Sequence, residues 1–210
     1  PREETDMLFN ILAIISVILM ITLLRRLVNI FPSLAACMIR WKENVNLEAS
    51  VKDSLDRNMI AVALIIPFCL TVGRFRLYDP SFLSGLGENA HTASIIGIFL
   101  LYCGIRIIMS MMVRTKKTGK TIRTAESAAY TFFIILTLVL ILCGGIMSFL
   151  KTDLSTIRDA MLWISACIYA LFLLRKTQIF ISGCSIFTAF LYLCALEILP
   201  TGVLVASALI

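Results

Sequence analysis

Long apolar runs separated by short charged stretches dominate the pattern of this chain. The runs cover about 7–24, 59–77, 91–113, 125–150, 160–174 and 179–200 or beyond. A helix needs roughly 20 mainly apolar residues to cross a bilayer, and none of the runs shows the alternation of a barrel strand. The pattern therefore predicts an all-α, polytopic integral membrane helical bundle with about six transmembrane helices.

Residues 27–45 follow a different, amphipathic pattern. Apolar residues recur at spacings of four and three from Leu27 to Val45, and Trp41 is among them. The charged residues Arg40 and Lys42 lie off that stripe. This pattern is typical of an interfacial amphipathic helix on the inner membrane surface, and a helix packed on the bundle is the alternative. No Gly- or Ser-rich linker divides the chain, so 1–210 is expected to form a single transmembrane domain.

Composition excludes a soluble protein and several kinds of site. The chain is 60% hydrophobic, with a mean hydropathy of +0.95. Its net charge of +6 comes from basic residues at the ends of the runs, so we expect no nucleic-acid partner. Seven cysteines without a Cys-x-x-Cys pair, and a single histidine, predict no disulfide framework, no metal site and no haem or other cofactor.

Basic residues also predict the orientation of the chain. With the N-terminus outside, the inner segments hold thirteen basic residues and the outer segments five. This bias favours six spans with both termini outside, and a five-span reading is possible if the short run 160–174 does not cross. The residues before the first run are net acidic, which argues against a cleaved signal peptide.

One acidic residue, Glu197, lies in the middle of the last apolar run. A charge at the centre of a span costs at least about 2.5 kcal/mol, so it normally has a partner or faces a cavity. Pro200 follows three residues later and deprives the carbonyl of Leu196 of its helical partner, which predicts a bend beside the acid. Pro67 predicts a second bend, inside the second run.

Depth in the membrane selects the expected partners of Glu197. At 1.5 Å per residue, Glu197 lies about 27 Å above an inner boundary at Ile179, whereas the arginines that end the second run lie about 22 to 26 Å up. His91 begins the third run at the same level. The predicted site is an outward-facing polar intramembrane layer of Glu197, Arg74, Arg76 and His91. A single helix-locking ion pair is the alternative.

The remaining candidate residues point to no catalytic chemistry. Arg106 is only about 12 Å above the inner boundary, so it is assigned to snorkelling or to an inner cavity. Gly119-Lys120-Thr121 lacks the earlier glycine of a phosphate-binding loop, because Arg114 stands there. The sequence contains neither His-Glu-x-x-His nor Gly-x-Ser-x-Gly. An enzyme is therefore disfavoured.

The phrase Leu-Tyr-Leu-Cys-Ala-Leu-Glu-Ile-Leu-Pro, residues 191–200, carries a resemblance. It resembles the end of an uncharacterised Bacteroidota membrane family, domain of unknown function 4271. Tyr130 and Arg175 also fit that resemblance. It implies an inner-membrane protein of a diderm bacterium, and it implies no activity.

These observations together predict a function class. Catalytic motifs and a transporter-like inverted repeat are absent, and the soluble segments are short. We therefore expect a non-enzymatic inner-membrane subunit or assembly scaffold, multi-pass in the bacterial cytoplasmic membrane. Its expected partners are the lipid bilayer and another membrane protein or a second copy of the chain. The alternative is a small transporter or lipid-handling protein that uses an outward-facing polar pocket around Glu197.

Overall fold

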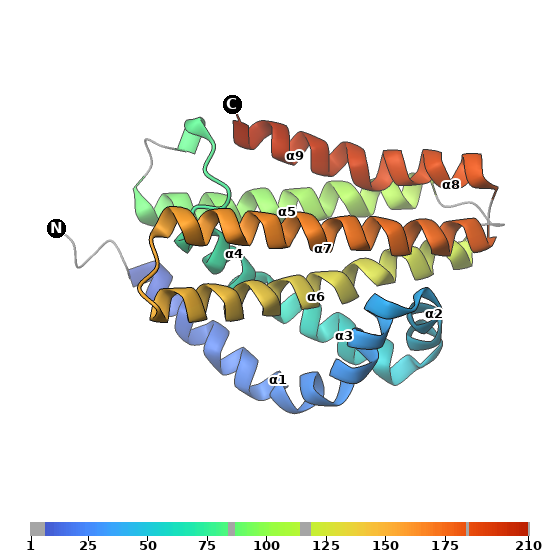
Figure 1. Cartoon of the computed structure of the whole chain (residues 1–210), viewed down its shortest axis with the longest axis horizontal. Helices are drawn as coiled ribbons and strands as arrows, with labels where there is room; N and C mark the ends of the chain where they lie inside the picture. Colours follow the sequence, from blue (N-terminus) through green and yellow to red (C-terminus); the bar gives the residue numbers. More distant parts are fainter. Residues whose placement is uncertain (1–6, 84–86, 114–118, 184, 210) are drawn as a thin grey trace.

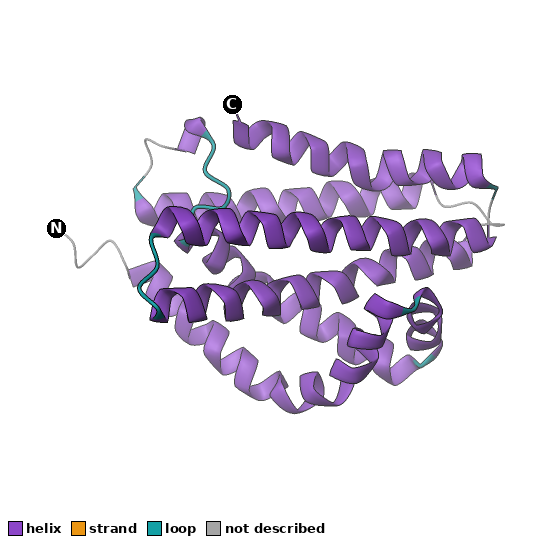
Figure 2. Cartoon of the chain, viewed as in Figure 1, coloured by secondary structure: helices purple, strands orange, loops and turns teal. Residues whose placement is uncertain are grey.

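The computed structural model describes residues 7–83, 87–113, 119–183 and 185–209, which form helices and short loops with no strand among them (Figure 2). Arg2 and the basic segment 114–118, which enter the orientation argument, lie outside these ranges. The helices are α1 (Met7–Ile39), α2 (Trp41–Ala49), α3 (Val51–Ala63), α4 (Ile65–Arg74), η1 (Ser81–Leu83), α5 (Glu88–Val113), α6 (Gly119–Phe149), α7 (Leu154–Gly183), α8 (Ile186–Leu193), η2 (Cys194–Ile198) and α9 (Leu199–Leu209).

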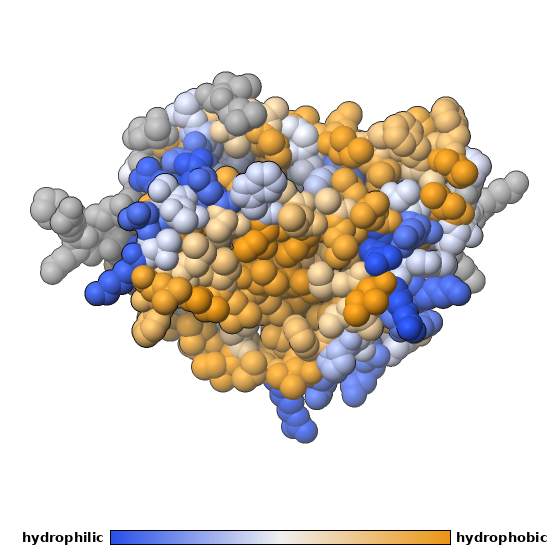
Figure 3. All heavy atoms as spheres, in the orientation of Figure 1, coloured by the Kyte–Doolittle hydropathy of each residue, from blue (hydrophilic) through white to orange (hydrophobic). Residues whose placement is uncertain are grey.

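Six helical segments are long and apolar enough to cross a membrane, which confirms the predicted helical membrane bundle. They are Met7–Ile39, Val51–Arg74, Asn89–Met112, Thr121–Phe149, Leu154–Gly183 and Ile186–Ala208. Figure 1 shows that α1 begins and α9 ends toward the same end of the bundle, as an even number of crossings requires. In Figure 3 hydrophobic residues cover the middle of the visible face, and hydrophilic residues gather toward its two ends.

The segment 27–45 is divided between two helices, which corrects the boundaries of the predicted amphipathic helix. Residues 27–39 continue α1, and the helix breaks at Arg40, whose backbone is extended, before α2 begins. The buried positions of this half of α1 are Leu27, Ile30, Leu34 and Cys37, which pack against α3 and α6. Phe31 and Val45, which belonged to the predicted stripe, are exposed. Packing against the bundle thus buries a face of the helix that lies next to the predicted stripe. The helix that does not span the membrane is the shorter α2.

The second span is interrupted where the sequence predicts a bend. Leu64 separates α3 from α4, and Pro67 lies in the first turn of α4. A proline in a first turn loses no helical hydrogen bond, because the amide groups there have no intrahelical acceptor. The hydroxyl of Thr71 donates to the carbonyl of Pro67 at 2.7 Å, which secures the turn that follows.

The hairpin of α6 and α7 forms the most extensive helix contact of the bundle. α7 contains 30 residues, so the fifth span is much longer than the predicted 160–174, and the sixth span begins at Ile186 rather than Ile179. The length of α7 removes the reason for a five-span reading. Both ends of the predicted fifth run were misplaced, because charged residues there were taken as membrane boundaries.

Aromatic residues and one close helix approach define the packing near the hairpin. Phe68 of α4, Phe99 of α5 and Phe133 of α6 form a mutual cluster with ring centroids 5.1 to 5.7 Å apart. Gly144 of α6 lies so close to the ring of Phe75 that an added Cβ would be 2.8 Å from it. The absence of a side chain at this position lets the end of α4 pack directly against α6.

Candidate functional site

Glu197 lies on a π-helical turn, η2, between α8 and α9. The amide of Leu199 donates to the carbonyl of Cys194, five residues back, which widens the turn. Pro200 supplies the physical reason, because it has no N–H and its ring would clash with a carbonyl four residues earlier in a regular helix. The predicted bend is therefore a local widening of the helix that presents Glu197 to the bundle interior, where it is 1% exposed.

Two cations from two other helices converge on this carboxylate. Arg106 of α5 donates through Nη2 to Oε1 of Glu197, and Lys176 of α7 donates through Nζ to the same oxygen. The side chains of Lys176 and Glu197 are each 1% exposed, and that of Arg106 is 23% exposed. We call these three residues the Glu197 cluster. It connects α5, α7 and the C-terminal helical segment.

Aromatic rings cover the cationic side of the Glu197 cluster. The ammonium of Lys176 lies 5.4 Å from the ring centroid of Phe172 and 5.7 Å from that of Phe180, and the guanidinium of Arg106 lies 5.8 Å from Phe172. The negative faces of aromatic rings attract cations in such positions. Phe172 and Phe180 therefore both exclude lipid from the ion pairs and contribute to holding the cations.

Further polar contacts follow the last helical segment away from Glu197. Tyr169 of α7 donates to the backbone carbonyl of Glu197 at 3.3 Å. The hydroxyl of Tyr102 contacts that of Thr201 at 3.0 Å. Nearer the end of α9, the hydroxyl of Tyr78 contacts that of Ser207 at 2.8 Å. The last segment thus has polar partners on α5, on α7 and in the loop after α4.

One oxygen of the Glu197 carboxylate takes no part in the ion pairs of the cluster. Both cations contact Oε1 of Glu197, and the buried Oε2 has no hydrogen-bond partner among the residues that the structure describes. Glu126 of α6 lies near enough for its charge to act on Lys176. Two acids and two bases from four segments therefore share one layer, so a change of charge on one acid leaves an uncompensated cation.

The structure corrects the predicted partners of Glu197. His91 contacts Asp79, with Nε2 3.2 Å from Oδ1, and Arg76 contacts the other carboxylate oxygen of Asp79 at 3.5 Å. Arg74, in the last turn of α4, is exposed. These residues lie toward the end of the bundle where α5 begins and α9 ends, away from the Glu197 cluster. Arg106, which the sequence assigned to snorkelling or an inner cavity, is one of the true partners.

The predicted partners of Glu197 were wrong because the last spanning helix begins at Ile186 and not at Ile179. With α8 beginning at Ile186, Glu197 lies eleven residues, about 16 Å, from the end of its helix. Arg106 and Lys176 are each seven residues, about 10 Å, from the ends of α5 and α7. All three helix ends lie at the same end of the bundle in Figure 1. Lys176 was missed because a basic pair after an apolar run looks like a membrane boundary.

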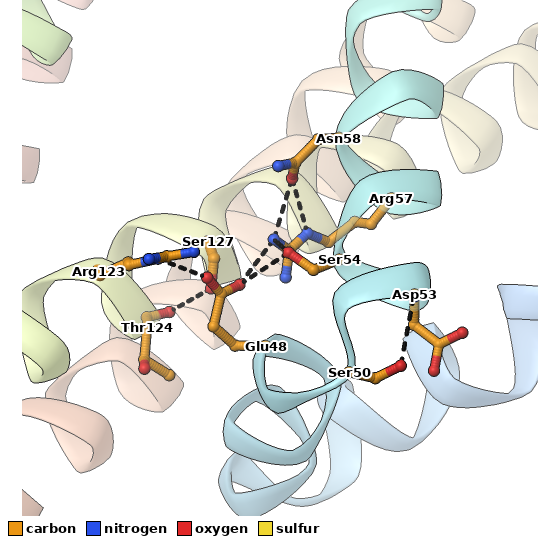
Figure 4. Close-up of polar contacts among 9 residues, drawn as sticks. All are labelled: Glu48, Ser50, Asp53, Ser54, Arg57, Asn58, Arg123, Thr124 and Ser127. Atoms are coloured by element: carbon orange, nitrogen blue, oxygen red, sulfur yellow. Dashed lines mark hydrogen bonds and ion pairs between the residues drawn. The ribbon is translucent and has the colours of Figure 1, made fainter.

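A second polar cluster joins α2, α3 and α6 at the same end (Figure 4). Glu48 of α2 accepts from Nη2 of Arg57 at 2.9 Å and from Nε of Arg123 at 3.0 Å. Arg57 is 1% exposed and also contacts Ser54 and Asn58. Burial alone would raise the pKa of Glu48, but the hydrogen bonds and charge of Arg57, with hydrogen bonds from Arg123 and Ser127, outweigh it, so the pKa lies below its usual value.

The described cysteines are free thiols, and no three His, Cys, Asp or Glu side chains come together as metal ligands within the described ranges. Cys184 lies outside those ranges. Among the described residues, the polar groups that come together around Glu197 are the carboxylates, the ammonium, the guanidinium and the hydroxyl groups described above.

The fold and the Glu197 cluster define a multi-pass helical membrane protein with a charged layer inside its bundle. A family model described as Domain of unknown function (DUF4271) matches residues 8–207, so the chain belongs to this family. The match includes all six spanning segments except one residue at the start of the first and one at the end of the last, and it contains every residue of the Glu197 cluster. Searches of curated proteins and of solved structures found no match.

Proposed function

We propose that the chain is a small membrane transporter in which the Glu197 cluster couples a proton to an anion. The observation that carries this proposal is the arrangement of the Glu197 carboxylate. Its Oε1 receives both Arg106 and Lys176, while its buried Oε2 has no hydrogen-bond partner among the described residues. A carboxylate that served only to lock helices would be expected to have both oxygens engaged.

The coupling follows from the charges of the cluster. As a carboxylate, Glu197 contacts the cations of α5 and α7 and, together with the nearby negative charge of Glu126, balances their two positive charges, so that no further anion is needed. When Glu197 takes up a proton on Oε2, Arg106 and Lys176 lose the negative charge that both of them contact. An anion can then replace it, because buried cations need a counter-charge. Loss of the proton restores the original ion pairs and expels the anion.

Two features of the fold support movement at this position. Single π-helical turns are frequent at functional sites, and η2, which carries Glu197, is such a turn. The hydroxyl contacts Tyr102 to Thr201 and Tyr78 to Ser207 continue from the cluster toward the end of the bundle that holds Asp79. These contacts favour an exit toward that end, which the distribution of basic residues assigns to the outside.

Transport assays on the full chain in liposomes test the proposal. Vesicles containing a pH-sensitive dye would be diluted into chloride, inorganic phosphate or gluconate, with the membrane potential fixed by valinomycin and potassium. We expect proton uptake that depends on one of the anions and that Glu197→Gln abolishes. Asp159→Asn, which removes an exposed acid at the other end of α7, is the matched control and should leave the rate unchanged.

The outcome is decisive if folding is monitored in parallel. Equal, anion-independent proton leak in the wild type, the Glu197→Gln variant and empty vesicles, with all proteins monodisperse, would reject transport of these ions. In that case the cluster has the structural role of joining three helices.

A second candidate function, a subunit or assembly scaffold, is favoured by the exposure of α1. Only 6% of the most apolar 18-residue stretch of α1 is buried within the chain, compared with 44% of the corresponding stretch in the span formed by α3 and α4. Ile14 and Ile21 are 60% and 66% exposed. Photo-crosslinking from these two positions in native membranes would show whether a protein covers this face, and crosslinks to lipid alone would count against it. For either function, the proposed location is a bacterial inner membrane.

A further inference from the structure

We infer that a basic hollow between α2 and α7 binds a phosphate-bearing anion, and that its natural source is the headgroup of an anionic phospholipid. The hollow has a volume of about 360 Å³ and lies apart from the Glu197 cluster. Its charged lining consists of Arg40, Lys42 and Arg175, against one acid, Glu43. The excess of positive charge comes from two helices that contact each other, so it belongs to one concave surface.

The guanidinium of Arg175 is held in a fixed position at the wall of this hollow. Its Nε donates to the backbone carbonyl of Met38 at 2.8 Å, and its Nη1 donates to Oε1 of Gln178 at 2.8 Å. The first bond joins α7 to the last turn of α1. A planar guanidinium that the protein has already oriented loses little freedom when it binds the oxygens of a phosphate.

The start of α2 adds to the positive potential. Arg40 precedes α2 in an extended conformation, and no side chain caps the amide groups of the first turn. The N-terminal end of a helix carries partial positive charge and favours an anion. Arg40 and Lys42 are exposed on either side of this helix start.

The position of the hollow favours a lipid as the source of the phosphate. It lies where the first spanning helix ends, and Ile39 in its lining is 70% exposed beside the basic residues. Trp41 also lines it, with the ammonium of Lys42 5.9 Å from its ring centroid. Tryptophan and basic residues side by side are typical of headgroup depth. In Figure 3 hydrophilic residues gather at this end of the molecule, next to the hydrophobic band.

Lipid retention by the full chain tests this inference. The protein would be reconstituted in phosphatidylcholine with or without phosphatidylglycerol, released into mild detergent and weighed with its bound lipids by native mass spectrometry. We expect preferential retention of phosphatidylglycerol. The preference should fall by about fivefold for each basic residue removed in Arg40→Gln and Lys42→Gln, because one basic residue near an anionic surface contributes about this factor.

The control removes the same charge from other exposed positions. Lys52→Gln with Arg158→Gln should retain phosphatidylglycerol as the wild type does. If the variant lacking both Arg40 and Lys42 does not fold, Lys42→Gln alone still tests the site, since this exposed lysine contacts only the face of Trp41 among the interactions described above.

A second measurement separates the two sources of phosphate. Inorganic phosphate would be added to the protein in phosphatidylcholine, and the shift in melting temperature would be recorded. A shift that Lys42→Gln removes, without any lipid preference, would assign the hollow to a soluble phosphate compound and overturn the lipid assignment. Unchanged lipid retention in the hollow variants, with no phosphate-dependent shift, would overturn the inference altogether.

Discussion

Lys176 and Glu197 form an ion pair inside the bundle, each 1% exposed, although they are 21 positions apart in the sequence and the chain reverses direction between them. Arg106 reaches the same carboxylate oxygen from a third helix. The carboxylate of Glu197 thereby accommodates both cations in an apolar environment. This arrangement also means that the stability of the bundle should depend on the three residues jointly.

Double-mutant cycles test that dependence. Glu197→Gln leaves Lys176 buried without its carboxylate and should lower the free energy of unfolding by about 3 to 5 kcal/mol. Lys176→Gln leaves Glu197 with Arg106 as its remaining cation and should cost less. The double variant should lose much less than the sum, and Arg106→Gln should show weaker coupling because its side chain is 23% exposed. Unfolding in mixed detergent micelles gives these values. Additivity of Glu197→Gln with both Lys176→Gln and Arg106→Gln, or strong coupling with Arg74→Gln, would contradict the observed pairing.

Gly144 and Gly145 are neighbours on α6 with opposite environments. A methyl group at Gly144 would be 2.8 Å from the ring of Phe75, whereas nothing lies within 4 Å of the corresponding position at Gly145. Gly144→Ala should therefore destabilise the protein by about 1 to 3 kcal/mol through overpacking. Gly145→Ala should be neutral or slightly stabilising, since alanine favours a helix over glycine. Thermal unfolding in detergent compares the two variants, and equal melting temperatures would refute the close contact.

Glu48 should make stability depend on pH. Its folded-state pKa lies below the usual 4.5, so the folded state holds the proton less tightly than the unfolded state does. The resulting stabilisation is fully present above about pH 4.5 and is lost as the pH falls through the lower, folded-state pKa. Glu48→Gln should lower stability near pH 7 and flatten the decline below pH 5. Glu43→Gln, on the same helix, is the control and should keep the decline of the wild type.

The orientation of the chain is a prediction that labelling can decide. In a variant without native cysteines, Lys52→Cys and Leu154→Cys place single thiols at exposed positions in α3 and at the start of α7. An impermeant maleimide applied to spheroplasts should label position 154 and leave position 52 unlabelled until the membrane is opened. Labelling of position 52 in intact spheroplasts would invert the topology and reverse the direction of the proposed proton movement.

Several features of this protein follow from the sequence by itself. The number and type of spanning helices follow from the long apolar runs, because a bilayer imposes a minimum length on each helix and requires every backbone polar group to be satisfied within it. Glu197 was identified as the central residue because an acid in such a run is costly. Pro200 predicted a disturbed turn beside it, since a proline in any helix interior removes a donor.

Only the tertiary structure decided which residues meet Glu197. Hydropathy along the chain treats Arg175 and Lys176 alike, as a boundary, yet Arg175 binds the end of α1 and Lys176 is buried against Glu197. A buried lysine is tolerated only where an acid from another helix compensates it, and one-dimensional spacing contains no information about such a partner. The same limit explains the segment 27–39, whose buried face was selected by contact with α3 and α6 rather than by its own periodicity.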